Sequence, residues 1–377
     1  MEKFHFVGGQ TCPESVPIQG LIEAAKQVLT RRGKQLVSYP SQVNQHDELI
    51  EVAAHRFERA QGISLPIENT IITTGSMQAI SLMVDILTHP GDTIITEELS
   101  YMGSLECFRH FQLNIVGIPV DVIDGMDVDA LEDTLKDLAS KSITPKFIYT
   151  IANYQNPTGA VLSLERRERM LELVQEYNIL ILEDDCYGGV DFEPDSLPQS
   201  LFALGNQQSV TYIASFSKIF VPGIRLGYLC TADRFVKQIH EMKRYLDAGT
   251  SALASFIVAE YLQDNLWSHV AKHNAIIKEK RDVLLEALTE HLTDYAKWNE
   301  PRGGLFVWIK LPEAINMNRL EQLSEHCGVR YDPGRTFHVR NKDIKYLRLS
   351  YAHMTQDEIR QGIALLAKCI EECVTAQ

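Results

Sequence analysis

The sequence contains no apolar run close to the roughly 20 residues that a membrane-spanning helix needs. Basic residues are also scarce: 36 Lys and Arg stand against 50 Asp and Glu, which gives a formal charge of −14. This balance argues against a protein that mainly binds nucleic-acid phosphates, although it allows a local basic pocket for a small phosphate. Residues 1–6 do not show a basic head followed by an apolar run, so no secretory signal is expected. We therefore expect a cytoplasmic protein that contacts neither membrane nor nucleic acid.

Three further patterns are absent. None of the seven cysteines forms a Cys-x-x-Cys pair, and no His pair lies near the closest two, Cys369 and Cys373. Reduced thiols are therefore favoured over disulfides or zinc, and no metal site is expected. Internal repeats are missing, which excludes a solenoid. No Gly-x-Gly-x-x-Gly follows a strand, which argues against a nicotinamide-dependent dehydrogenase.

The first two-thirds of the chain alternate short β-branched runs with helical periodicity. The runs are apolar on both alternating faces, as strands are when helices cover both sides of a sheet. Helical segments between them span 78–87, 131–139 and 164–177. This rhythm predicts an α/β fold with a mostly parallel sheet. The predicted strands are 70–73, 93–96, 114–117, 147–150, 179–182, 210–213 and 226–229.

Beyond about residue 235 the pattern changes. A helical tract runs from 235 to 292 with a break near 248–251, and strands follow near 305–309 and 346–350. A closing helix starts at 356. Strands and helices are segregated here, which predicts a smaller α+β domain. We expect an N-terminal arm and helix packing on the small domain (1–35), a large domain (36–260) and a small C-terminal domain (261–377).

Two loops at strand ends carry residues suited to ligand binding. In Thr74-Gly75-Ser76-Met77-Gln78, Gly75 allows a turn and Ser76 can cap the next helix, which leaves free N–H groups for a phosphate. An ordinary capped helix explains the same residues. In Asn153–Gly159, Asn-Pro-Thr-Gly forms a turn that holds Asn156 at the end of a strand, where α/β sheets bind ligands.

Two further segments carry charge next to apolar strands. Glu183, Asp184 and Asp185 directly follow one strand, either as solvated loop charges or as a partner for a cationic ligand atom. Lys218 lies among small hydroxyl and apolar residues in Ser215-Phe216-Ser217-Lys218-Ile219. Burial would lower its pKa and free its lone pair for Schiff-base chemistry, whereas a surface position is the ordinary alternative.

Taken in order, these motifs resemble those of one family. The order is a Gly-Ser turn, Tyr101, Asn-Pro-Thr-Gly, Asp-x-x-Tyr, Ser-x-Ser-Lys and Arg225. It resembles the fold-type I pyridoxal-phosphate (PLP) enzymes, specifically the class I and II aminotransferases. The nearest subgroup is that of the aminoadipate-type and aromatic aminotransferases, with the related aminotransferase-like domains of MocR regulators. The resemblance runs from Phe6-Val7-Gly8-Gly9 to the strand of Arg348.

The resemblance implies a role for each residue at the reacting end of PLP. Lys218 would hold PLP as an aldimine and later move a proton between the substrate Cα and C4′ of the cofactor. Asp184 would keep the pyridine nitrogen protonated, which makes the ring an electron sink. Asp185 is the rival, but only Asp184 gives the Asp-x-x-Tyr spacing. Tyr187 and Asn156 would both bind the phenolic oxygen.

The remaining roles concern the ring face, the phosphate and the partner subunit. Tyr101 would stack on the pyridine ring, with a plain core tyrosine as the alternative. Tyr39 matches a tyrosine that reaches the phosphate of the partner subunit, which implies a homodimer with composite sites. The phosphate would be held by Ser76, the backbone of Met77, Ser215, Ser217 and Arg225.

The substrate side is less specified. Arg348 would grip the substrate α-carboxylate, together with Asn156 and the arm at Gly9. The arm from Phe4 to Gly20 has no Lys or Arg, which favours an apolar or aromatic side chain over an acidic one. Against this, Arg335 follows a Pro-Gly turn and either approaches the site or lies on the surface. Cys186 either packs beside Asp184 or makes the site sensitive to oxidation.

The sequence therefore predicts a PLP-dependent aminotransferase that moves an amino group between an L-amino acid and a 2-oxo acid by a ping-pong mechanism. The closest alternative is another PLP reaction on the same fold, namely decarboxylation, β-elimination or substitution. A ligand-sensing regulator is disfavoured, because the arm motif begins by Phe6 and leaves no room for a preceding DNA-binding domain.

Overall fold

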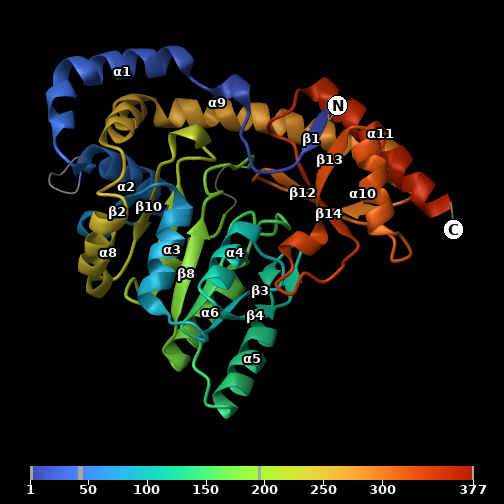
Figure 1. Ribbon diagram of the computed structural model, residues 1–377, viewed down its shortest axis with the longest axis horizontal. Coiled ribbons are helices and arrows are strands. Elements are labelled where there is room, and N and C mark those ends of the chain that lie inside the picture. The colour runs from blue at the N-terminus through green and yellow to red at the C-terminus, as the bar shows by residue number, and fades with distance from the viewer. Residues whose placement is uncertain (1–2, 41–45, 194–196, 376–377) are drawn as a thin grey trace.

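Two β-sheets organise the chain (Figure 1), whose computed structural model describes residues 3–40, 46–193 and 197–375. The larger sheet has seven strands, one at each predicted position, and β10 is its one strand antiparallel to its neighbours. Most of their side chains are buried on both faces, which explains the apolar runs in the sequence, while the edge strand β4 is only partly buried. In spatial order the strands are β2 (Thr70–Thr73), β10 (Gly227–Cys230), β9 (Val210–Ser215), β8 (Leu180–Asp185), β7 (Phe147–Thr150), β3 (Thr93–Glu97) and β4 (Asn114–Ile118).

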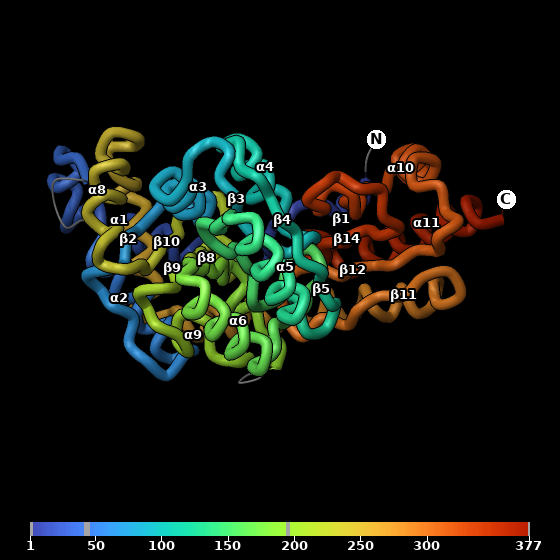
Figure 2. The backbone as a smooth tube through the Cα atoms, turned by 90° about the horizontal axis from the view of Figure 1, so that it is seen from below, coloured from blue at the N-terminus to red at the C-terminus, as the bar shows by residue number. Residues whose placement is uncertain are grey.

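Helices cover both faces of this sheet. Figure 2 shows α3 and α4 on one side of the strands and α6 and α9 on the other. The predicted helices near 78–87, 131–139 and 164–177 are confirmed with slightly wider bounds. The helices of this region are α2 (Asp47–Gln61), α3 (Ser76–Leu87), α4 (Met102–His110), α5 (Val128–Ser140), α6 (Leu164–Tyr177), α7 (Leu201–Leu204) and α8 (Asp233–Leu246).

The C-terminal third builds a second sheet of five strands. The predicted strands near 305–309 and 346–350 are confirmed, and they pair with each other in this sheet. Helices α10 (Met317–His326) and α11 (Gln356–Thr375) pack on it, and both chain ends lie on this side of the molecule (Figure 1). The strand order is β1 (Phe4–Phe6), β13 (Val329–Pro333), β14 (Tyr346–Ser350), β12 (Phe306–Lys310) and β11 (Lys297–Trp298).

One long helix connects the two sheets. Helix α9 (Ala252–Leu292) contacts α2 of the large domain and α11 of the small one. The predicted break between two helices near 248–251 is confirmed, because α8 ends at Leu246 and α9 begins at Ala252. The predicted boundary between domains at residue 260 falls inside α9 and stays a prediction.

The N-terminal arm connects the same two regions along another path. Strand β1 pairs with β13 in the small sheet, and α1 (Ile18–Arg32) lies along α9. A short helical turn, Pro13–Ser15, joins them. No helix of the part that the structure describes is long and apolar enough to cross a membrane.

Candidate active site

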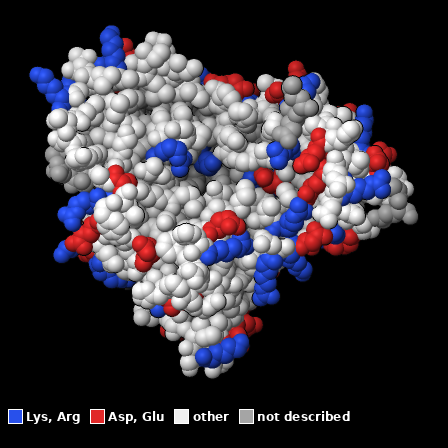
Figure 3. Space-filling model, in the orientation of Figure 1, with Lys and Arg blue, Asp and Glu red and all other residues white. Residues whose placement is uncertain are grey.

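A buried cavity of about 180 Å³ lies at the carboxyl ends of the parallel strands, between the two sheets. Figure 3 shows that the middle of this face holds a few Lys and Arg side chains in a largely uncharged area. The fold brings twelve of the thirteen predicted site residues to the cavity wall. These are Gly9, Ser76, Met77, Tyr101, Asn156, Asp184, Tyr187, Ser215, Ser217, Lys218, Arg225 and Arg348.

Lys218 follows β9 and points into this cavity. Its Nζ donates a hydrogen bond of 2.6 Å to the backbone oxygen of Gly9, in the N-terminal arm. Burial, with a smaller contribution from the positive charges of Arg348 and Arg225, lowers the pKa of Lys218 to about 8. About a tenth of the amine is therefore neutral at pH 7, and the neutral form is the one that attacks a carbonyl carbon.

Asp184 and Asp185 face different surroundings. Asp184 lines the cavity, and its Oδ2 accepts a hydrogen bond of 2.6 Å from Tyr149 Oη. Asp185 is absent from the described cavity wall; Tyr212 Oη and Asn153 Nδ2 donate to its two oxygens at 2.6 and 2.8 Å. The geometry thus favours Asp184 over Asp185 as the partner of a cationic ligand atom.

The environment of Asp184 sets its charge. Burial raises the pKa of the Asp184 carboxyl, and hydrogen bonds from Cys186 and Tyr149 oppose this shift. The alternative of solvated loop charges is wrong, because Glu183, Asp184 and Asp185 all lie within β8 and are buried. Their backbone pairs with β9, so the sheet ladder continues through the acidic residues.

Tyr187 and Asn156 contact each other on the cavity wall. Asn156 Nδ2 donates a hydrogen bond of 3.0 Å to Tyr187 Oη. Asn156 Oδ1 in turn accepts a hydrogen bond of 2.6 Å from Arg348 Nη1. Asn156 therefore links Tyr187, which is expected to bind the cofactor, to Arg348, which is expected to bind the substrate.

Arg348 lies on β14 with only 1% of its surface exposed. Its guanidinium lies between the rings of Phe306 and Phe337, at 4.0 and 4.6 Å from their centroids. It also pairs with Asp332. Its Nε is buried and has no hydrogen-bond partner among the described residues, so a donor remains for a carboxylate.

The start of α3 forms the opposite end of the cavity. Ser76 does not cap this helix as expected: Gly75, with φ of 77°, occupies the N-cap position. A side chain at Gly75 would overlap the guanidinium of Arg225, so glycine lets this cation approach the helix start. Arg225 Nη1 reaches Ser217 Oγ at 3.5 Å. Hydroxyls, an arginine and free helix N–H groups together suit a phosphate dianion.

Four other residues complete the comparison with the sequence. Tyr101 is half-buried on the cavity wall, whereas Tyr39 is 64% exposed and absent from the described wall. Arg335 pairs with Glu321 through both terminal nitrogens, outside the cavity, so its surface alternative holds. Cys186 is buried beside Asp184, and burial raises the pKa of its thiol well above the usual range.

Sequence reasoning missed several residues around the site. Tyr149 had a usable signal, because it lies in a predicted strand whose neighbour carries Asp184. Asp332 and Phe337 had none, because β13 and the turn after it reach the site only through the tertiary fold. His273 was missed too; its Nε2 lies 2.8 Å from the backbone oxygen of Lys218.

Together, these residues provide a partner for each polar group of PLP. The cavity offers a buried amine, a carboxylate for the ring nitrogen and two donors for the phenolic oxygen, together with a phosphate seat and a free arginine donor. This fold and this site define a fold-type I PLP enzyme.

Comparison with known proteins identifies the family. Residues 9–366 match the family described as "Aminotransferase class I and II", and the chain belongs to it. It is 33% identical to aromatic-amino-acid aminotransferase 1 of Thermococcus litoralis, over 97% of this chain and 87% of that protein. The protein is thus a PLP-dependent aminotransferase, as the sequence predicted.

Two solved structures support the same conclusion. One is the α-aminoadipate aminotransferase LysN of Thermus thermophilus, complexed with N-(5′-phosphopyridoxyl)-L-leucine, with a TM-score of 0.91 and 29% identity. The match covers 99% of this chain and 93% of that one. The other is an archaeal alanine:glyoxylate aminotransferase, with a TM-score of 0.91 and 34% identity over 99% of this chain and 91% of that one.

Proposed function

We propose that the cavity described above is the active site of this aminotransferase and that Lys218 holds PLP covalently through Nζ. The observation that carries the proposal is the meeting of Lys218, Asp184 and Arg348 in one buried cavity from three distant parts of the chain. When bound, PLP withdraws electrons from the substrate Cα and makes its proton acidic.

The chain's own residues then divide the work. Once the substrate amine had replaced it on PLP, Lys218 Nζ would be a free amine, neutral in part at pH 7 because its pKa is lowered to about 8, and it would take the proton from Cα. The Asp184 carboxylate keeps a proton on the ring nitrogen. Tyr187 and Asn156 donate to the phenolic oxygen, and Tyr101 covers the ring face.

Binding at both ends of the cavity fixes the orientation of the reactants. Arg348, with Asn156 and the arm at Gly9, binds the α-carboxylate and orients the Cα–H bond. At the other end the phosphate is held by Ser76, the Met77 backbone, Ser215, Ser217 and Arg225. Because Phe306 and Phe337 flank Arg348 and exclude water, its ion pair with the substrate is stronger than it would be in solution.

We further propose a homodimer with composite sites, located in the cytoplasm. Exposed apolar residues gather on the arm, on α1 and at the end of α8, including Ile18, Val37 and Tyr245. Val37 and Tyr245 are 89% and 71% exposed, as expected for residues that a partner covers. Tyr39 lies in the same region, so it is available to a partner's phosphate. The free cysteines suit a reducing compartment.

The proposed amino donor is an L-amino acid with an apolar or aromatic side chain. The ring of Phe306 lines the cavity, and Arg335, the candidate for binding a side-chain acid, is held by Glu321 outside it. The name of the aromatic aminotransferase agrees with this class, whereas LysN is named for the acidic α-aminoadipate, although its complex holds a leucine derivative.

The test is an absorption titration of the purified holoenzyme with single L-amino acids and no acceptor. Phenylalanine, tyrosine and leucine should bleach the visible band and release one matching 2-oxo acid per site, while glutamate needs higher concentrations. Release of carbon dioxide or ammonia instead would contradict amino-group transfer by this chain.

A second experiment tests the attachment point. Borohydride should fix PLP to the wild-type chain, and a tryptic peptide containing Lys218 should carry it. The Lys218→Ala variant should retain PLP only reversibly. Fixed PLP in that variant would refute the assignment of Lys218.

A further inference from the structure

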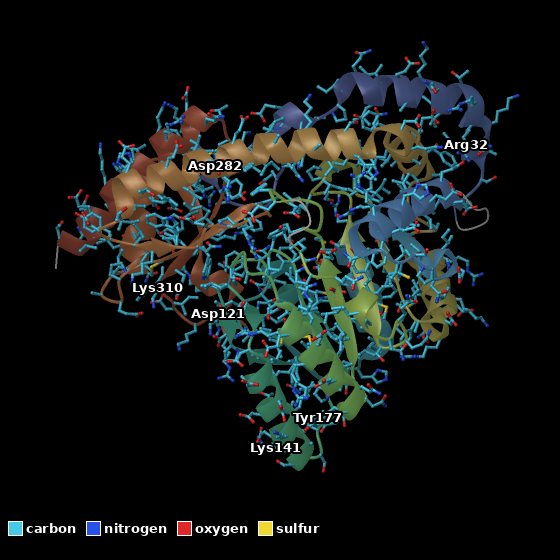
Figure 4. The ribbon with its side chains drawn as sticks, turned by 180° about the vertical axis from the view of Figure 1, so that it is seen from behind. Arg32, Asp121, Lys141, Tyr177, Asp282 and Lys310 are labelled. Atoms are coloured by element: carbon cyan, nitrogen blue, oxygen red, sulfur yellow. The ribbon has the colours of Figure 1, made fainter. Side chains whose placement is uncertain are left out.

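A second cavity, of about 630 Å³, lies between the two domains and shares none of its described lining residues with the active site. Its volume is in the range of small-molecule pockets. One wall comes from β11, β12 and the start of β14, and the other from Gly159, Val161 and the turn between β5 (Val120–Asp121) and β6 (Gly125–Met126). Figure 4 labels Lys310 and Asp121, which mark the two walls.

Aromatic rings form the small-domain wall. Trp308 and Tyr346 stack with centroids 5.2 Å apart and planes at 13°, and Trp298 adds a third ring from β11. Val122 and Ile123 face them from the other domain, and Ile123 is 72% exposed. An apolar group between these walls would cover surface that water now contacts.

The charges around this cavity are unbalanced. Lys297 and Lys310 are directly opposite each other in the β11–β12 register. Like charges in this position repel each other and destabilise the pair of strands. Neither lysine has a carboxylate within 4 Å among the described residues, and Glu300 is the one acid on the described wall, where Arg302 adds a third cation. An anion between the two lysines would relieve the repulsion.

The cavity is also connected to the active site by a short path. Asn299 Nδ2 donates a hydrogen bond of 2.8 Å to the backbone oxygen of Thr158, and Asn299 Oδ1 accepts one of 2.8 Å from Trp308 N. Thr158 and Gly159 belong to the loop that carries Asn156, whose side chain contacts Arg348. A ligand in this cavity would therefore rest on the loop that carries Asn156, which contacts Arg348.

We propose that this interdomain cavity binds a small aromatic carboxylate at a site separate from the active site. The ring packs against Trp298 and Tyr346, with the buried Trp308 supporting Tyr346 from behind, and the carboxylate lies between Lys297 and Lys310. The combination of stacked rings and paired cations selects both parts of the ligand, because a neutral ring leaves the lysines unpaired and a small inorganic anion leaves the rings exposed.

Equilibrium dialysis of the PLP-loaded enzyme with radiolabelled phenylacetate tests the proposal. The wild-type chain should bind more than one phenylacetate per subunit, because the active-site arginine also attracts carboxylates. In the Lys297→Glu/Lys310→Glu variant one of these binding events should weaken, with its dissociation constant for phenylacetate raised at least tenfold. The neutral analogue 2-phenylethanol should compete at this event at least tenfold less well than unlabelled phenylacetate.

Two controls separate this site from the active site and from a general charge effect. The Arg348→Lys variant should weaken only the other binding event. The Lys136→Glu/Lys141→Glu variant makes the same charge change at the end of α5 and should bind as the wild type does. A single binding event that Arg348→Lys weakens, or equal binding by the two charge-reversed variants, would overturn the proposal. Circular dichroism of each variant shows whether it is folded.

Trp298→Ala provides an independent variant, since it removes a ring and leaves both lysines in place. It should weaken the same binding event that Lys297→Glu/Lys310→Glu removes. Two of the three tryptophans, Trp298 and Trp308, line this cavity. Phenylacetate should therefore change the intrinsic fluorescence of a Trp267→Phe variant as it does that of the wild type, and an unchanged emission in both proteins would count against the site.

Discussion

At the residue level, Asp184 has a partner that its own motif does not contain. Tyr149 Oη donates to Asp184 Oδ2 and accepts a hydrogen bond of 2.9 Å from Ser104 Oγ. The carboxylate is thus held by a side chain from the neighbouring strand. This arrangement keeps the pKa of the buried Asp184 from rising further, because a hydrogen bond to a carboxylate stabilises its charged form.

The first prediction concerns this hydrogen bond. Tyr149→Phe should raise the pKa of Asp184 and move the acid limb of the kcat profile to higher pH. A hydrogen bond to a charged group contributes about 1.5–3 kcal/mol, so the acid limb should move up by roughly one to two pH units. The measurement is kcat against pH, with Tyr295→Phe, which lies away from the cavity, as the control. An unmoved acid limb would leave Tyr149 with a packing role only.

The second prediction concerns Arg348. Arg348→Lys keeps the charge and loses the planar fork, so KM should rise at least tenfold for every amino donor, with a smaller change in kcat. Arg335→Lys, whose arginine pairs with Glu321 away from the cavity, is the control and should leave both constants unchanged. If KM rises for acidic donors alone, Arg348 binds the side chain and not the α-carboxylate.

Single residues also show where sequence reasoning is sufficient. Lys218, Asp184 and Asn156 could be predicted because each lies at a strand end within a local motif, and strand ends converge in a parallel sheet. Asp332 and Phe337 could not be assigned a role, because their contacts with Arg348 depend on how the strands and turns of the small domain meet. The charges of Glu183 and Asp185 were ambiguous, since only the structure shows that their strand is buried to its end.

At the level of elements, α9 connects the arm to the active site. His273, at its middle, is fully buried: its Nδ1 lies 2.8 Å from Ser15 Oγ, and its Nε2 lies 2.8 Å from the backbone oxygen of Lys218. Burial, aided by the charges of nearby His269 and Lys280 and opposed by the hydrogen bond to the Lys218 backbone, lowers the pKa of His273 to about 4. The helix therefore supports the Lys218 segment with a neutral imidazole.

The third prediction follows from this histidine. Between pH 6.5 and 4 the unfolded chain binds a proton at His273 that the folded chain does not, so stability falls as the pH falls through this window. The loss is of order 3 kcal/mol when complete. His273→Asn should flatten the pH dependence of the unfolding free energy between pH 7 and 4.5, measured by urea denaturation. His55→Asn, an exposed control, should leave the slope as it is in the wild type.

The elements differ in how far their sequences determine them. The seven central strands were predicted because each is a continuous apolar run between turn residues. Strand β1 was expected only as an arm, because its three residues become a strand by pairing with β13 far along the chain. Strands β5 and β11, of two residues each, were missed because such short segments carry no periodicity.

At the level of the whole molecule, the proposed dimer makes a prediction about mixed subunits. Lys218→Ala and Tyr39→Phe should each reduce activity in their own dimers, because one loses the amine and the other a phosphate contact given to the partner. In a hybrid dimer the Tyr39→Phe subunit keeps Lys218 and receives Tyr39 from the other subunit. One of its two sites is therefore complete, and activity should return to about half that of the wild type.

Refolded mixtures, with the hybrid isolated by a charge tag, provide the measurement, and light scattering gives the mass. As the control, each variant is refolded alone in the same way, which gives dimers of two identical subunits. If the hybrid is no more active than the mean of the two parent dimers, Tyr39 acts in the active site of its own subunit or in neither active site. A monomeric mass would contradict the dimer itself.

The pairing of β1 with β13 also affects how the chain is made. Gly8, just after β1, hydrogen-bonds to Asp332, 324 positions later. Ribosomes add roughly 5–20 residues per second, so the arm waits roughly 15 to 65 s for its partner strand to be synthesised. During this time Phe4 and Phe6, both buried in the finished fold, are exposed on the nascent chain. The arm is thus made first but pairs only after most of the chain exists, so a chaperone has long access to it.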